Sequence, residues 1–440
     1  MTPTYEEALS YLKSREKFGI KFGLANIDQL AGDLGRPELQ YPSVLIAGTN
    51  GKGSTAAILA SILAAAGRRV GRYTSPHIRF LEERIQVDGA PISHDELASI
   101  AGRVADSAAK LNEPTFFEAV TAIAFTFFAE RNVDIAVLEV GMGGRWDATN
   151  IAPATVSVIT PVGFDHEHFL GNTIEAIAAE KAAIIKQGRP VVVGELVPEA
   201  LEVVRAEAHR QNAELIRAED GVGIRAEPRA SGQAVWLTTP SRDYGRLELS
   251  LMGEHQLSNL VLAVRVAERL LPELSVDQVR RGVASTVWAG RLQRIEGAPA
   301  LLLDAAHNVM AAEQLARFLR AHPHEHRVLL FGVMKDKRAL EMLTELLPHV
   351  SYFIATRPEM SRARGPGPLA AFAREHGTPA EAISSSAEAL ARARELAGPD
   401  GEVVVAGSIF LLGEVVEALE TLSSSEPISG AAGTVARTPA

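Results

Sequence analysis

The sequence predicts an α/β protein of two domains, the first built on a doubly wound, mostly parallel sheet. Three observations lead to this prediction. The chain has 440 residues, more than a single hydrophobic core usually supports. Short β-branched runs alternate with helical stretches rich in alanine and leucine, a pattern typical of parallel sheets. This alternation stops between about residues 214 and 252 and resumes after residue 299, as expected where one domain gives way to another.

Composition narrows the class of function. Hydrophobic residues make up 47% and charged residues 22% of the chain, which is ordinary for a globular protein. The formal net charge of −10 argues against binding to nucleic acid or an anionic membrane. Because there are no cysteines, disulfides, thiolate catalysis and thiolate zinc sites are excluded. The first 20 residues are too polar for a signal peptide, and no apolar run reaches the ~18 residues of a membrane span. We therefore expect a cytoplasmic enzyme.

The first domain is expected to cover residues 1–288. Alternating strands and helices open it, a small antiparallel insertion follows at 214–252 around the turn sequences "RASGQ" and "PSRDYG", and two helices close it. The expected strands lie at 44–47, 134–140, 155–160 and 190–193, and the expected helices at 54–66, 95–110, 117–130, 173–186, 255–271 and 275–284.

A second α/β series begins after a predicted linker at 289–297, where glycine and proline cluster. We expect this domain to span residues 298–422. Its predicted strands lie at 300–303, 327–332, 351–356 and 402–406, with helices between them. Residues 423–440 are small, polar and rich in proline and glycine, so we expect a disordered tail.

A glycine-rich loop follows the first expected strand in "SVLIAGTNGKGSTAAILASILAAAG", residues 43–67. Glycines allow backbone N–H groups to converge on a phosphate, the following helix adds its positive end, and Lys52 supplies charge. The general phosphate-loop pattern would require glycine at Ile46 and a hydroxyl directly after Lys52, but here the hydroxyl is delayed to Ser54. The sequence therefore favours nucleotide binding, with a helix-capping glycine turn as the alternative.

Two further segments place polar groups at strand ends. Glu139 ends an apolar strand and is a candidate Mg²⁺ ligand or an exposed strand-end acid. His166 follows another strand, and on its own it is more often structural than a magnesium ligand. Lys181 stands next to Glu180 on an expected helix and, taken alone, would be a solvated ion-pair partner.

The loop sequence "GTNGKGST" resembles the ATP loop of the Mur ligase superfamily, in the form carried by folylpolyglutamate synthase and dihydrofolate synthase. Ordered motifs over about residues 20–415 support the resemblance, including "YTSPHIRF", "PTFFEAV", "VGMGGRWDATN", "FDHEHFLGNT", "EKAAIIK", "GEHQLSNL", "GRLQRI", "LLLDAAHN" and "FGVMKDKR". The resemblance implies an N-terminal P-loop ATPase domain and a C-terminal Rossmann-like glutamate-ligase domain. Arg338 departs from the family, where an acid often follows Asp-Lys.

The resemblance also implies roles for individual residues. It assigns Mg²⁺ to Ser75, Glu139 and His166, and a CO₂-derived carbamate to Lys181. Asp304 and His307 are implied to face the incoming glutamate or ATP, and they join Lys52, Lys181 and His166 as catalytic candidates. The implied ATP contacts are Asn50, Gly51, Lys52, Gly53, Ser54, Asn259, Arg291 and Asp304, and the implied pterin or folate contacts are Thr115, Phe116, Phe117, Glu118, Trp146, Asp147 and Ala148.

The implied activity is ATP-dependent joining of L-glutamate to a folate through an acyl phosphate, within folate and one-carbon metabolism. Dihydropteroate and tetrahydrofolate are both expected acceptors, because Asp147-Ala148 is more similar to bifunctional members than to members that only make polyglutamates. Other readings are a polyglutamate-only enzyme, another Mur-type amide ligase, a P-loop kinase or NTPase, and a binding protein without catalysis. We expect a monomer whose partners are small molecules, with no nucleic acid or membrane partner, and closure of the two domains around ATP.

Overall fold

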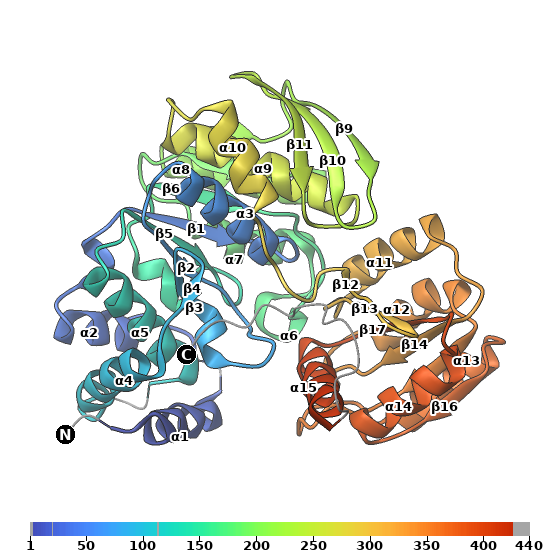
Figure 1. Ribbon diagram of the computed structural model, residues 1–440. Helices are drawn as coiled ribbons and strands as arrows, with labels where there is room; N and C mark the ends of the chain where they lie inside the picture. The colour runs from blue at the N-terminus through green and yellow to red at the C-terminus, as the bar shows by residue number, and fades with distance from the viewer. Residues whose placement is uncertain (1–2, 20, 112–113, 426–440) are drawn as a thin grey trace. The chain divides into compact units, whose positions relative to one another are not determined.

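The structure is a computed structural model that describes residues 3–19, 21–111 and 114–425. The chain divides into two compact units, Met1–Trp288 and Ala289–Ala440 (Figure 1). Helix α15 (Ile409–Ser425) continues three residues into the segment expected as a tail, and the rest of that segment lies outside the described residues.

The first unit contains a large sheet, in which the described residues form eight strands in the order β4-β3-β2-β5-β1-β6-β7-β8. The strands from β2 to β8 are parallel, whereas β3 and β4 extend one edge in antiparallel fashion. The strands are β1 (Ser43–Ala47), β2 (Val70–Tyr73), β3 (Ile85–Val87), β4 (Ala90–Pro91), β5 (Ile135–Glu139), β6 (Val156–Ile159), β7 (Val191–Val193) and β8 (Leu215–Arg217).

Helices cover both faces of this sheet because its central strands are apolar on both sides. Leu45 and Ala47 of β1 belong to a core that includes α1 (Tyr5–Arg15), α2 (Ala25–Asp33), α4 (His94–Ala108) and α5 (Phe116–Glu130). Val44 and Ile46 point to the opposite face and belong to a core with α3 (Lys52–Ala65), α9 (His255–Leu270) and α10 (Val276–Ala284). This arrangement confirms the predicted doubly wound α/β class.

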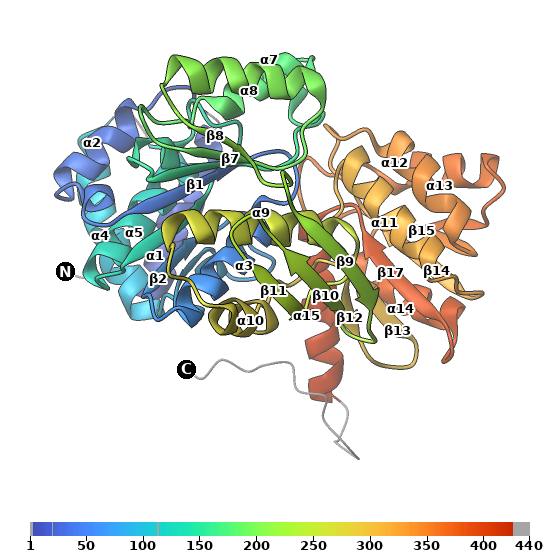
Figure 2. The same ribbon diagram turned by 90° about the horizontal axis from the view of Figure 1, so that it is seen from above.

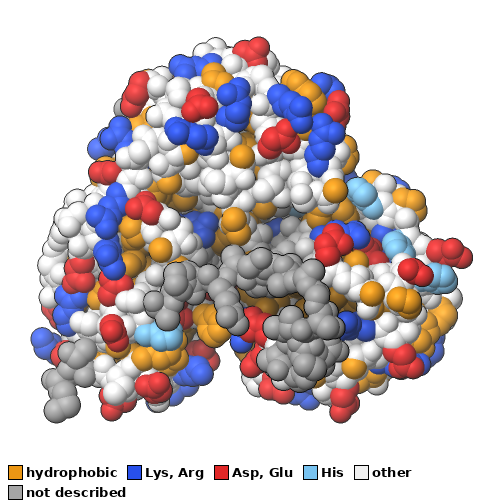
Figure 3. All heavy atoms as spheres, in the orientation of Figure 1, with side chains coloured by type: hydrophobic (Ala, Val, Ile, Leu, Met, Phe, Trp, Pro, Cys, Tyr) orange, Lys and Arg blue, Asp and Glu red, His pale blue; other side chains and the backbone are white. Residues whose placement is uncertain are grey.

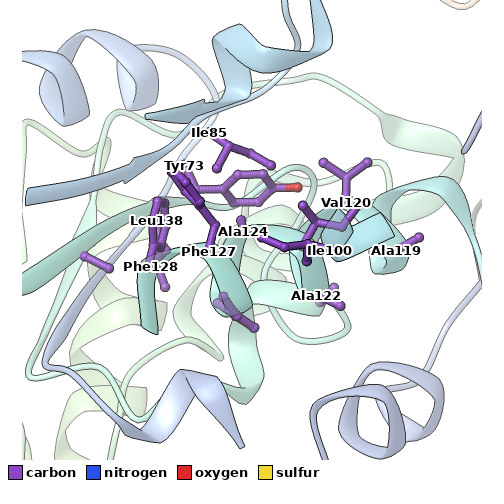
Figure 4. Packing of buried hydrophobic residues seen from close by; sticks show 14 of the residues in the cluster. Tyr73, Ile85, Ile100, Ala119, Val120, Ala122, Ala124, Phe127, Phe128 and Leu138 are labelled. Atoms are coloured by element: carbon purple, nitrogen blue, oxygen red, sulfur yellow. The ribbon is translucent and has the colours of Figure 1, made fainter. Parts of the chain in front are cut away.

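Tyr73 illustrates the packing on the α5 side. Its ring lies among Ile85, Val120 and Leu138 (Figure 4), and its hydroxyl oxygen lies 3.1 Å from the hydroxyl oxygen of Thr121. The buried hydroxyl therefore has a partner, as a polar group in an apolar core requires. Beyond β6, α7 (Ile174–Ala182) and α8 (Pro198–Arg210) lie side by side (Figure 2) and cover β7 together. The first unit also contains α6 (Glu167–Leu170) and the short 3₁₀ helices η1 (Glu16–Phe18), η2 (Pro37–Leu39), η3 (Leu81–Arg84) and η4 (Ala148–Ile151).

The antiparallel insertion is present but shorter than predicted. Its sheet consists of β9 (Gly223–Pro228), β10 (Gln233–Thr238) and β11 (Asp243–Leu249). Residues 215–217, predicted within the insertion, instead form β8 and pair in parallel with β7. Acidic and basic side chains are interspersed over the surface that carries α10 and this sheet (Figure 3), and neighbours such as Arg225 and Glu227 form ion pairs.

Helix α7 ends earlier than predicted, at Ala182 rather than near residue 186. The backbone tightens there, because Ile184 and Ile185 donate to the carbonyls of Lys181 and Ala182, three residues back. Gly188, with φ +65°, completes the turn toward β7. Lys186 therefore lies outside the helix, in the segment that joins α7 to β7.

The second unit has a sheet in the order β12-β13-β17-β14-β15-β16 within the described residues, all parallel except β12 at the edge. Residues 293–295 of the predicted linker form this edge strand. The strands are β12 (Gln293–Ile295), β13 (Ala300–Leu303), β14 (Arg327–Phe331), β15 (Tyr352–Ala355), β16 (Ala380–Ala382) and β17 (Glu402–Ala406). The remaining helices are α11 (Val309–Ala321), α12 (Ala339–Leu346), η5 (Leu347–His349), α13 (Pro366–Glu375) and α14 (Ser386–Ala397).

In the portion of the chain that the structure describes, none of the helices combines the length and the apolar character needed to cross a bilayer.

Candidate active site

The glycine-rich loop joins β1 to α3 and passes very close to two neighbouring elements. A Cβ atom added to Gly48, whose φ is +150°, would lie 1.8 Å from Thr160 Oγ1 at the end of β6. One added to Gly51, with φ +86°, would lie 2.4 Å from Asn259 Oδ1 on α9. Both positions therefore require glycine. The loop passes too close to Thr160, after β6, and to Asn259, on α9, to accept a side chain at either position.

Hydrogen bonds hold the loop in shape. Thr49 Oγ1 donates to the carbonyl of Gly163 at 2.9 Å and accepts from its N–H at 3.0 Å. Lys52 Nζ donates to the carbonyls of Gly48 and Thr49 at 3.2 and 3.0 Å. Among the residues that the structure describes, no side chain caps the N-terminus of α3 at Gly51, and Ser54 is buried in its first turn. The loop thus combines an uncapped helix N-terminus with an ammonium group, which suits a phosphate.

Glu139 and Ser75 meet beside this loop because β5 and β2 are adjacent parallel strands. The Ser75 N–H donates to Glu139 Oε2 at 3.0 Å. The same oxygen lies 3.3 Å from where a Cβ of Gly53 would be. A buried carboxylate and the Ser75 segment therefore face the third glycine of the loop. Oxygen donors of this kind fit Mg²⁺.

His166 lies at the start of α6 in a left-handed backbone conformation, with φ +53°. Its N–H donates to Asp165 Oδ1 at 2.8 Å, and its ring Nε2 lies 4.0 Å from Asp165 Oδ2. Among the described residues, no three histidine, aspartate or glutamate side chains gather closely enough to hold a metal ion by themselves. A magnesium site here would therefore also need oxygens from Ser75, from the nucleotide or from a modified lysine.

Lys181 is buried and its Nζ donates to the Gly48 carbonyl at 2.9 Å, the same oxygen that Lys52 contacts. Burial, together with the charge of Lys52, lowers the pKa of Lys181 to about 7, while Asp165 opposes this shift. Lys181 is not a solvated partner of Glu180, because Glu180 Oε1 accepts from Arg145 Nε at 2.8 Å. Burial and the charge of Lys52 both favour the neutral amine form of Lys181.

The residues expected to contact the pterin divide into two groups. Thr115 and Glu118 form the capping box of α5, with the Thr115 hydroxyl donating to Glu118 Oε2 at 2.8 Å. Phe116 lies under the guanidinium of Arg84, and Phe117 packs against Tyr73. These four residues explain the start of the helix and its packing.

The second group lies on the loop after β5. Trp146 is 46% exposed, whereas Asp147 and Ala148 are buried. Asp147 accepts from the N–H groups of Gly141, Met142 and Thr149 and from the Thr149 hydroxyl. Burial raises the pKa of Asp147 and these hydrogen bonds oppose the rise. Its carboxylate thus folds the loop back on itself.

Three residues beside the phosphate loop were not assigned from the sequence. Gln256 is completely buried, and its Oε1 accepts from Asn259 Nδ2 at 2.9 Å, which turns Asn259 Oδ1 toward the loop. The guanidinium of Arg72 lies 5.2 Å from the ring centre of Trp288. A Cβ at Gly53 would lie 2.5 Å from Trp288 Cζ2. Only Gln256 had a sequence signal, since it lies one helical turn before Asn259.

In the second unit, Asp304 joins two segments that carry predicted ATP contacts. Its two carboxylate oxygens accept from the N–H groups of Leu292 and Ala306, each at 2.9 Å. Burial raises the pKa of Asp304, and the charge of Arg291 opposes this. His307 Nδ1 lies 2.9 Å from the Ala305 carbonyl oxygen. Arg291, Asp304 and His307 are therefore brought together within this unit.

Comparisons with known proteins agree over nearly the whole chain. The Mur ligase middle domain matches residues 46–267, and the Mur ligase glutamate ligase domain matches residues 290–409. The dihydrofolate synthase/folylpolyglutamate synthase of Bacillus subtilis (strain 168) is 39% identical over 367 residues, which cover 80% of this chain and 85% of the relative.

Two solved structures extend the match. Mycobacterium tuberculosis folylpolyglutamate synthase complexed with ADP has a TM-score of 0.88 at 34% identity, covering 96% of this chain and 99% of that chain. E. coli FolC in complex with DHPP and ADP has a TM-score of 0.84 at 31% identity, with coverage of 96% and 99%. The chain therefore belongs to the Mur ligase family, within its group of dihydrofolate synthases and folylpolyglutamate synthases.

Proposed function

We propose that the chain adds L-glutamate to folates at the expense of ATP, converting dihydropteroate to dihydrofolate and extending tetrahydrofolate to its polyglutamates. The observation that carries this proposal is the meeting of the phosphate loop, Glu139 and Lys181 at one edge of the sheet. Relatives named for both activities, and solved relatives complexed with ADP, support it. The enzyme class is an ATP-dependent carboxylate–amine ligase.

In the proposed reaction, the folate carboxylate oxygen attacks the γ-phosphorus of ATP and ADP leaves, which forms an acyl phosphate. The amine of glutamate then attacks the acyl carbon, loses a proton, and phosphate departs. Neither step needs a nucleophile from the protein. The protein must neutralise phosphate charge and align the reactants, and Asn50, Gly51, Lys52, Gly53 and Ser54 supply the cradle for this.

Glu139 and Ser75 would hold Mg²⁺ beside this cradle, with His166 as a further ligand. When bound, the ion would neutralise charge on the phosphates. Asn259, Arg291 and Asp304 are proposed to contact the nucleotide, and His307 the incoming glutamate. Trp146, Asp147 and Ala148, together with Thr115, Phe116, Phe117 and Glu118, are proposed to form the pterin side. We further propose that the enzyme acts as a monomer.

Lys181 is proposed to react with CO₂. Its neutral nitrogen would attack the carbon of CO₂ and lose a proton, giving a carbamate anion beside Lys52. Because the reaction needs an uncharged amine, the lowered pKa of Lys181 favours it. Lys181→Ala should reduce turnover by about 10²-fold or more, and a short carboxylic acid such as propionate should restore part of it. Lys110→Ala, at an exposed position, is the control. Full activity of Lys181→Ala would refute the carbamate.

A paired assay tests the function. Purified protein is given ATP, Mg²⁺ and L-glutamate with either dihydropteroate or tetrahydrofolate, and ADP and the folate products are measured. Products from both acceptors are expected. Product from tetrahydrofolate alone would establish the polyglutamate-only alternative. ATP hydrolysis that is independent of glutamate and pterin would instead indicate a kinase or NTPase.

A further inference from the structure

Lys186 has a specific role in the structure that its place in the sequence does not explain. It follows the early end of α7, and its Nζ donates to two oxygens of Asn150, the backbone carbonyl and the side-chain Oδ1, both at 2.7 Å. Burial lowers the pKa of Lys186 to about 8. An ammonium group in such surroundings is costly unless its hydrogen bonds are well formed.

The side-chain amide of Asn150 also contacts two other backbone segments. Its Nδ2 donates to the carbonyl of Arg145 at 3.2 Å, at the start of the same loop, and to the carbonyl of Ala183 at 3.3 Å, just after α7. All of the polar atoms of this amide are therefore engaged. Asn150 joins the two ends of the loop 145–150 to each other and to the end of α7.

Arg145 makes the second attachment. Its N–H donates to the Glu180 carbonyl at 2.9 Å, its Nε to Glu180 Oε1 at 2.8 Å, and its Nη2 to the Ala179 carbonyl at 3.2 Å. The backbones are closely packed here, because a Cβ at Gly144 would lie 2.7 Å from the Glu180 carbonyl oxygen. We name Arg145, Asn150, Glu180 and Lys186 the loop clamp.

The loop clamp encloses residues from two proposed parts of the site. Between Arg145 and Asn150 lie Trp146, Asp147 and Ala148, on the pterin side. Between Glu180 and Lys186 lies Lys181, which contacts the phosphate loop through Gly48. Since attachments exist at both ends of both segments, the loop and the end of α7 cannot shift independently.

We propose that Lys186 and Asn150 are positioning residues that fix the pterin-side loop to α7, so that the folate site and Lys181 are aligned together. This inference rests on the proposed function. A residue needed only for stability would lower the apparent kcat through the amount of folded enzyme and would leave the KM values for both substrates unchanged. A positioning residue should affect the folate and the chemical step but not ATP binding, because the phosphate loop has its own ties through Thr49 and Gly163.

The test compares Lys186→Met, Lys186→Arg and a control, Arg189→Met, an exposed residue three positions along the same segment. We expect Lys186→Met to raise KM for the folate acceptor and to lower kcat, together reducing kcat/KM by about 10- to 100-fold. KM for ATP should stay within about twofold of the wild-type value, because the phosphate loop keeps its own hydrogen bonds between Thr49 and Gly163. Lys186→Arg should recover part of the loss, and Arg189→Met should match the wild type.

Unchanged folate kinetics in Lys186→Met, or an equal rise in KM for ATP, would overturn the proposal. If Lys186→Met does not fold, Asn150→Asp replaces it, because an aspartate keeps acceptors for Lys186 and removes the two N–H donations. Wild-type constants for that variant would also overturn it. Failure of the proposed function would look different, because the wild-type enzyme itself would then show no glutamate-dependent turnover.

Discussion

Lys181 is a buried amine whose lowered pKa makes the stability of the protein depend on pH. The unfolded chain holds this lysine near its ordinary pKa of 10.5, against about 7 in the folded state. Between these values the unfolded chain carries a proton that the folded chain lacks at this position. Through this group, the free energy of unfolding therefore rises as pH increases from 7 toward 10.5.

Lys181→Met removes this contribution. We expect the stability of the variant minus that of the wild type to be largest at pH 7 and to fall steadily up to pH 9.5. Urea unfolding in CO₂-depleted buffer at several pH values measures the difference. A difference that does not change with pH would show that Lys181 titrates at an ordinary pKa.

Single residues were predictable from the sequence only where their own segment carried a signal. Glu139 stands at the end of an apolar strand, and Lys52 and Lys181 lie in motifs that resemble those of a known family. Arg72 and Trp288 were not assigned, because contacts between distant segments place them beside the phosphate loop, whereas Gln256 lies in a motif that pointed only to its neighbour Asn259. Lys186 lies in the motif "EKAAIIK", but the sequence predicted no role for it, because its partner Asn150 lies 36 residues away.

At the scale of elements, the contact between α3 and Trp288 limits what the loop tolerates. Gly53 lies in the first turn of α3 and its φ is not in the left-handed region, so alanine suits its backbone. The obstacle is the indole of Trp288, only 2.5 Å from the added Cβ. The effect of substitution is therefore steric.

Gly53→Ala should destabilise the protein by about 1–3 kcal/mol through overpacking and weaken ATP binding. Thermal unfolding and nucleotide titration measure the two effects. Gly32→Ala is the matched control, because that exposed glycine of α2 has a helical backbone and an added Cβ would come no closer than 3.6 Å to the Arg36 guanidinium, so the change should be neutral or stabilising. If Gly53→Ala were as stable as the wild type, Trp288 would not pack there as described.

Long elements were predicted well, and short strands were predicted only where they are continuous apolar runs, as in Val191–Val193. The apolar runs of β1 and β5 and the helices α5 and α9 carry clear periodicity. Strands β2, β3, β4 and β12 have only two to four residues each, too few to show alternation. Their partners define them, as with β8, which pairs in parallel with β7 although the three strands that follow it in sequence are antiparallel. The end of α7 was also missed, because its turn depends on local hydrogen bonds.

At the scale of the whole molecule, each unit has its own sheet and core, which agrees with the predicted fold class. The second unit also contains a buried ion pair, in which Arg327 Nε donates to Glu402 Oε2 at 2.6 Å. Arg327 is only 2% exposed, and it also donates to the carbonyls of Leu319 and His349. Removing the charge of Glu402 would leave a buried cation without its counter-ion.

Glu402→Gln should therefore destabilise the second unit by about 3–5 kcal/mol. Calorimetry should show a lower transition temperature for this unit, with little change in the transition of the first. Glu381→Gln, at the more exposed pair with Arg392, should cost at most about 1 kcal/mol. A uniform shift of the whole unfolding curve would show that the effect of Glu402→Gln is not confined to the second unit.

Trp288 also gives the molecule an internal optical probe. Its indole lies between the cation of Arg72 and the third glycine of the phosphate loop, and it is one of three tryptophans in the chain. Indole fluorescence responds to nearby charge, so a nucleotide arriving at the loop should change its emission. With Trp146 and Trp236 replaced by phenylalanine, the light from one side chain would report each binding event without any added label.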